Sequence, residues 1–203
     1  MKKLISLSLV LTMVLMLVSC GVLTGNKTEI TRGKIEGNVY TNEVLNFKFT
    51  KPDSWMYYTD EEIAQSVNLS ADMLKEDKFK DSLKDNASLF DMMVIDTLTG
   101  TNINMGYENL SKSFASNITV DQYIDVLKKQ FADITAMTVV FPDKYETVKL
   151  GQNEFTKVEC KTTMNGLDFT QVYYLHKIDG YMCFLTVTIM NGYTVADIEN
   201  MFK

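Results

Sequence analysis

The single histidine and one of the three cysteines are spaced so that they could form a base and a nucleophile. His176 and Cys183 flank Asp179-Gly180, a dipeptide that predicts a two-residue hairpin turn between apolar runs. Such a turn pairs Ile178 with Tyr181, and it therefore places His176 opposite Cys183 on one face of a sheet. A cysteine nucleophile also needs a group that orients the histidine and an oxyanion site. Because we identify neither, we assign no catalytic residue and expect a packed thiol beside a half-buried imidazole.

A second hairpin signal decides whether the cysteines of the folded region form a disulfide. Exported proteins often pair their cysteines, but Asn165-Gly166 predicts a turn that sets Cys160 opposite Gln171. In this register Cys160 and Cys183 lie on opposite faces of the sheet. A disulfide requires the two Cα atoms to lie within about 7 Å, so we predict two free, buried thiols.

The N-terminus has the pattern of an export signal. Two lysines precede an uncharged apolar run over residues 4–18, and the run ends at Ser19 and Cys20. It is therefore shorter than the stretch of about 20 apolar residues that spans a membrane. The residues Leu-Val-Ser-Cys at 17–20 resemble the lipobox of bacterial lipoproteins, in which the cysteine is acylated and becomes the mature N-terminus. The resemblance implies a palmitate-type lipid anchor on Cys20 and a location on the outer face of the cytoplasmic membrane. An ordinary secretory signal is the alternative.

Composition excludes several classes of partner and chemistry. The chain has 20 basic and 26 acidic side chains, and residues 1–19 carry two of the lysines and no acid, so export makes the protein more acidic than its net charge of −6. Nucleic acid would repel such a surface. The sequence has no phosphate-binding glycine loop, no calcium-loop motif and no histidine cluster. We therefore predict no nucleic-acid partner, no cofactor and no dedicated metal site, with a weak surface cation site as the alternative left open.

The chain divides into a signal peptide over 1–19, a lipid-anchored tether over 20–38 and one domain over 39–203. The tether is predicted because residues 21–38 have no apolar periodicity and contain four glycines. Helices begin at capping boxes formed by Thr59 and by Thr119, each with an acid or amide side chain three residues later. The predicted helices span 60–74, 75–86, 120–131 and 195–202.

The strands alternate with turn residues over the remaining length. A hairpin around Thr99-Gly100 joins 92–95 to 103–107, and an earlier strand includes Phe47 and Phe49. A meander follows, with strands over 145–150, 155–164, 167–177 and 181–190. The last strand is apolar on both faces, which is typical of the middle of a sheet that is covered on each side. We therefore predict an α+β fold, a three-layer α/β/α sandwich with a central, mainly antiparallel sheet.

The spaced residues Tyr40, Asn42, Phe47, Phe49, Pro52 and Trp55, followed by this order of elements, resemble the PsbP-like superfamily. The resemblance covers roughly 39–203 and is closest to the small lipoproteins of low-GC Gram-positive bacteria. It implies an α/β/α sandwich. The better-known members, an extrinsic photosystem II subunit and a Ran-binding import factor, act as binding or assembly modules rather than enzymes, and neither function transfers to this chain.

Aromatic side chains offer the remaining candidate site. We expect Trp55 and Phe169 in the core, whereas Tyr57 and Tyr58 are equally compatible with the core and with a binding groove. The function predicted first is a surface-anchored, non-enzymatic binding or assembly module of the cell envelope, with an envelope protein as one candidate partner. The alternatives are an envelope hydrolase or transferase that uses Cys183 and His176, and a small-ligand carrier with an apolar pocket between sheet and helix.

Overall fold

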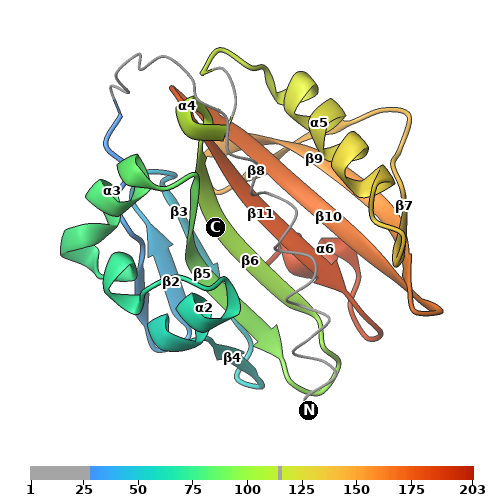
Figure 1. The fold of residues 1–203 in the computed structure, drawn as a ribbon. Helices are drawn as coiled ribbons and strands as arrows, with labels where there is room; N and C mark the ends of the chain where they lie inside the picture. The colour runs from blue at the N-terminus through green and yellow to red at the C-terminus, as the bar shows by residue number, and fades with distance from the viewer. Residues whose placement is uncertain (1–27, 114–115) are drawn as a thin grey trace.

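An antiparallel sheet of eight strands runs through the centre of the computed structural model, which describes residues 28–113 and 116–203 (Figure 1). Seven strands follow the order β4-β5-β6-β11-β10-β9-β7, and β8 pairs with β9. The mixed α+β fold with a central antiparallel sheet is as predicted. The strands are β4 (Trp55–Tyr57), β5 (Ser88–Asp96), β6 (Asn102–Asn109), β7 (Met137–Val140), β8 (Glu146–Leu150), β9 (Asn153–Met164), β10 (Leu167–Ile178) and β11 (Tyr181–Ile189).

The two hairpin turns set the register of the central strands. Asn165 and Asp179 have φ angles of 52° and 48°, and these left-handed conformations are the ones that a two-residue turn of this type requires. Leu167 consequently pairs with Met164, and Ile178 with Tyr181, as predicted. Strand β11 lies between β10 and β6 and is buried along its whole length, as its apolar sequence indicated.

Side-chain caps start three of the helices. Thr59, Thr119 and Thr194 each accept a hydrogen bond from the backbone N–H three residues on, and the side chain at that position bonds back to the cap. The helix predicted over 60–74 is wrong in its second half, because the helix ends at Ser66 and Asn68 adopts φ 56°. The helices are α2 (Asp60–Ser66), η2 (Ala71–Leu74, a 3-10 turn), α3 (Glu76–Asp85), α4 (Leu110–Ser113), α5 (Val120–Ala132) and α6 (Val195–Glu199).

The two faces of the sheet are covered differently. On one face lies α5 (Figure 1). Its Phe131 ring is 5.9 Å from the ring of Tyr173 on β10. On the other face lie α6 and a three-stranded sheet of β1 (Lys34–Glu36), β2 (Val39–Asn42) and β3 (Phe47–Thr50). Phe47 of β3 packs on Phe155 of β9, with ring centroids 6.4 Å apart. The large sheet is therefore the middle layer of three.

The folded body begins earlier than the predicted boundary at residue 39. Ile30 is buried, and β1 pairs with β2 from Lys34 to Glu36, so the predicted tether over 20–38 is wrong for its last residues. The partners of this segment are remote in sequence, which is why local periodicity does not reveal them. Strand β7 was also missed. Among the residues that the structure describes, no helix is both long and apolar enough to cross a membrane.

Candidate functional site

Cys183 and His176 lie opposite each other on β11 and β10, as the hairpin register predicted. The imidazole is engaged elsewhere: its Nδ1 atom is 2.7 Å from the carbonyl oxygen of Glu154, and its ring packs on Phe155 with centroids 5.2 Å apart. No hydrogen bond joins Cys183 to His176 in the described part of the chain. The pair therefore lacks the contact through which a histidine activates a thiol.

The electrostatic surroundings of both thiols disfavour a nucleophile. Cys183 is fully buried, and burial raises its pKa well above the ordinary thiol value, with the charge of Asp91 acting in the same direction. Burial likewise raises the pKa of Cys160 to about 12. Reactive cysteines have a lowered pKa and some exposure. Both cysteines are free and buried, as predicted, and they behave as small core residues.

The tyrosines predicted as binding residues are both half-buried. The Tyr57 ring packs against Phe49 with centroids 6.5 Å apart, and its hydroxyl donates to the carbonyl oxygen of Asn38 at 3.2 Å. Tyr58 donates its backbone N–H to Met93. Trp55 and Phe169 are in the core, as predicted. A binding role for Tyr57 and Tyr58 stays a prediction.

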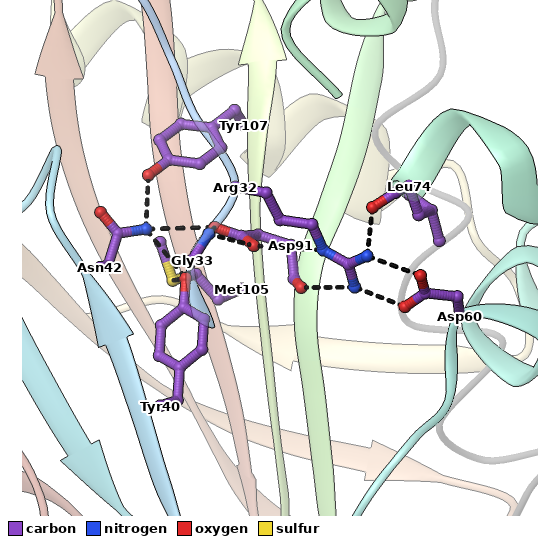
Figure 2. Close-up of polar contacts among 9 residues, drawn as sticks. All are labelled: Arg32, Gly33, Tyr40, Asn42, Asp60, Leu74, Asp91, Met105 and Tyr107. Atoms are coloured by element: carbon purple, nitrogen blue, oxygen red, sulfur yellow. Dashed lines mark hydrogen bonds and ion pairs between the residues drawn. The ribbon is translucent and has the colours of Figure 1, made fainter. Parts of the chain in front are cut away.

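A buried carboxylate lies at the centre of the polar network that Figure 2 shows. Asp91 is on β5 at an irregularity in the pairing with β6, and it is almost completely inaccessible to solvent. It accepts hydrogen bonds from the Tyr40 hydroxyl at 2.6 Å, from the Asn42 amide at 3.1 Å and from the backbone N–H of Gly33 at 2.9 Å. The Asn42 amide also donates to the hydroxyls of Tyr40 and Tyr107. Strands β2, β5 and β6 thus meet around one carboxylate.

Arg32 extends this network to the surface (Figure 2). Its guanidinium bonds to both carboxylate oxygens of Asp60 at 2.6 and 2.7 Å, donates to the carbonyl oxygen of Leu74 and lies 3.7 Å from Asp91. A two-pronged arginine–carboxylate contact fixes orientation as well as distance. Arg32 therefore joins the segment before β1 to α2, to η2 and to the sheet. Arg32 is the chain's only arginine. This uniqueness could have drawn attention to Arg32, which the sequence analysis did not single out.

The protonation of the buried acids follows from their surroundings. Burial raises the pKa of Asp91 to about 6, although the hydrogen bonds from Tyr40 and Gly33 and the charge of Arg32 oppose the rise. Burial also raises the pKa of Glu108 to about 7, against its hydrogen bonds with Ser113 and Tyr123. Raised carboxylate pKa values occur at catalytic sites. Asp91, however, is fully enclosed by its partners, so we interpret its network as a structural tie.

A pocket of about 670 Å³ lies where β10 runs past the end of β11, and we call it the end pocket. This volume is in the usual range for small-ligand sites. Within the described ranges, no group of three or more histidine, cysteine or acidic side chains is arranged to hold a metal ion. The residues that line the end pocket include Lys161, Thr162, Asp168, Phe169, Met190 and Tyr193.

Comparison with known proteins finds a likeness in overall arrangement. The solution structure of cyanobacterial PsbP (CyanoP) from Synechocystis sp. PCC 6803 aligns with 90% of this chain and with 98% of its own, at a TM-score of 0.49 and 10% sequence identity. No family model matches the sequence, and no curated protein matches it.

We predict that iodoacetamide at neutral pH leaves Cys160 and Cys183 unmodified in the native protein and modifies both in denaturant, because a buried thiol of raised pKa has almost no thiolate. Peptide mapping by mass spectrometry assigns the modified sites. The control is Leu98→Cys, since Leu98 is 82% exposed and a thiol there reacts without denaturant. Rapid native modification of Cys183 would contradict the inert assignment and support the hydrolase or transferase alternative.

We also predict that the free energy of unfolding falls as the pH rises through about 6 and 7, the pKa values of Asp91 and Glu108 in the folded protein. In the unfolded chain both carboxyls titrate near 4, so folding binds protons between the unfolded and folded pKa values of Asp91 and Glu108. The free energy of unfolding is then highest at the acidic end of that window. Asp91→Asn removes the share of Asp91 in this pH dependence, about 2–3 kcal/mol. Urea midpoints measured from about pH 4 to about pH 8 test this; an unchanged slope in Asp91→Asn would count against the buried acid.

Proposed function

We propose that this protein is a lipid-anchored, non-enzymatic binding or assembly module of the bacterial cell envelope. In this proposal the lipid on Cys20 holds it at the outer face of the cytoplasmic membrane. From the sequence resemblance we also infer that it is a PsbP-like lipoprotein of the low-GC Gram-positive type. The signal peptide and Cys20 lie outside the described residues.

The observation that carries the proposal is the short connection between the anchor and the folded body. The lipobox cysteine is residue 20, and the chain is already buried at Ile30. About ten residues extend at most about 36 Å. Because Arg32 and Gly33 are bound to Asp60 and Asp91, the body cannot move further from the membrane without breaking that network.

The chemistry of the interior supports binding over catalysis. The only cysteine–histidine pair of the described chain has a buried thiol of raised pKa and a histidine directed to a backbone carbonyl. Asp91 is saturated with donors from its own fold. The end pocket, in contrast, is lined by polar, charged and apolar groups, a mixture that suits recognition of a ligand or a partner segment.

We predict that Cys20→Ser abolishes palmitate labelling and moves the protein from the membrane fraction to the soluble fraction, because acyl chains on one cysteine supply the hydrophobic free energy of anchoring. Ser19→Ala is the matched control, since it keeps a small residue before the cysteine and should leave labelling unchanged. Metabolic labelling and fractionation measure both properties. Palmitate labelling that persists in Cys20→Ser would refute the lipid anchor.

A further inference from the structure

The described chain starts at one end of the large sheet and is fixed there. The backbone N–H of Thr28 donates to the carboxylate of Asp179 at 2.8 Å, and the Thr28 hydroxyl donates to the same oxygen. Asp179 lies in the turn between β10 and β11. Glu29 then forms an ion pair with Lys80 of α3, and Ile30 is buried. The place where the chain enters the folded body is therefore defined.

Strand β10 joins this end of the large sheet to the opposite end (Figure 1). The turn at 165–166 precedes β10, and the turn at 179–180 follows it. The end pocket lies at the first of these turns, because Asp168 and Thr170 at the start of β10 line it. Asp168 comes eleven residues before Asp179, about 36 Å along an extended strand. We call the two ends the pocket end and the Asp179 end.

The pocket end also carries exposed apolar side chains. The loop that follows β11 lies there, and in it the backbone N–H of Met190 donates to the Thr101 hydroxyl at 3.0 Å. The connection between β5 and β6 therefore lies at the pocket end, and its Leu98 is 82% exposed. Leu167, at the start of β10, is 53% exposed. Both leucines lie far along the sheet from Thr28.

The Asp179 end gathers segments from other parts of the chain. Lys177, at the end of β10, donates from Nζ to the carbonyl oxygen of Ile118 at 2.8 Å. The turn between β8 and β9 lies at the same end, since β9 runs antiparallel to β10 and starts there. The exposed residues Asn117 and Gln152 therefore mark the Asp179 end.

The length of chain between the proposed anchor and Thr28 limits how the body can be placed on a membrane. Eight residues separate Cys20 from Thr28, and they extend at most about 29 Å. A body that rests on its pocket end would lift the Asp179 end about 36 Å from the lipid. The chain is too short for that arrangement, so the body either stands on the Asp179 end or lies on its side.

The sides of the body do not suit contact with lipid. Residues 60–85, which include α2, η2 and α3, carry eight acidic and four basic side chains, a balance that anionic headgroups repel. On the opposite side, the exposed positions 121, 122, 125 and 129 of α5 are all polar or charged. A helix that lies in a membrane surface needs an exposed apolar face, whereas the apolar face of α5 is buried on the sheet.

We infer that the lipidated protein stands with its Asp179 end towards the membrane, so that the end pocket opens away from the lipid. The surface that meets the headgroups is then the Asp179 end, and the end pocket is left accessible from the envelope. This inference rests on the proposed anchor at Cys20. It deepens the proposed function by stating which surface faces the lipid.

Energy transfer from a single donor dye to an acceptor dye on lipid headgroups tests the orientation. The lipidated full-length protein is bound to preformed vesicles of phosphatidylglycerol and phosphatidylethanolamine. The donor is attached at Asn117→Cys or Gln152→Cys on the Asp179 end, or at Leu98→Cys or Leu167→Cys on the pocket end; the two native thiols of the folded body are buried. Transfer at the Asp179 end should be at least about twofold higher, because the ends lie about 36 Å apart.

The possible failures separate the orientation from the anchor. Equal transfer from both ends, or stronger transfer from the leucine positions, in lipidated protein that sediments with the vesicles would overturn the orientation and leave the anchor intact. Protein that carries no lipid would refute the anchor and the orientation with it. A Gly-Ser insertion after Gly25 lengthens the connection and should reduce the difference between the ends; an unchanged difference would contradict the argument from chain length.

Discussion

A carboxylate buried in the core of a protein imposes a constraint on everything around it. Removing a charge from water is costly unless hydrogen-bond donors replace the water, and Asp91 receives such donors from Tyr40, Asn42 and Gly33. Tyr40 and Asn42 belong to β2, and Gly33 lies directly before β1. The constraint therefore fixes the small sheet on the large one and gives the N-terminal segment a defined position.

The buried polar groups on the two faces of the large sheet differ in how far they are hydrogen-bonded. On the face of the small sheet, the polar groups around Asp91 satisfy one another, and aromatic contacts such as Phe47 with Phe155 fill the rest. On the α5 face, Gln171 and Thr188 are buried without partners.

Local chemistry decided which features could be predicted from the sequence. Asn165-Gly166 and Asp179-Gly180 require left-handed backbone conformations, so they fixed the register and the faces of Cys160 and Cys183 before any contact was known. The capping boxes at Thr59 and Thr119 fixed two helix starts in the same way. Interactions between remote residues were not visible: Arg32 reaches Asp60 and Asp91, and β7 pairs with the far end of β9.

Hydrogen exchange at the Gly33 amide tests the central tie most directly. This N–H donates to both oxygens of Asp91, at 2.9 and 3.1 Å, and it lies in a segment whose sequence is typical of a flexible spacer. If the buried carboxylate holds the segment, the amide exchanges only when the body unfolds, and Asp91→Asn accelerates its exchange. Exchange of Gly33 in the unaltered protein at the rate of an unstructured peptide would contradict the account.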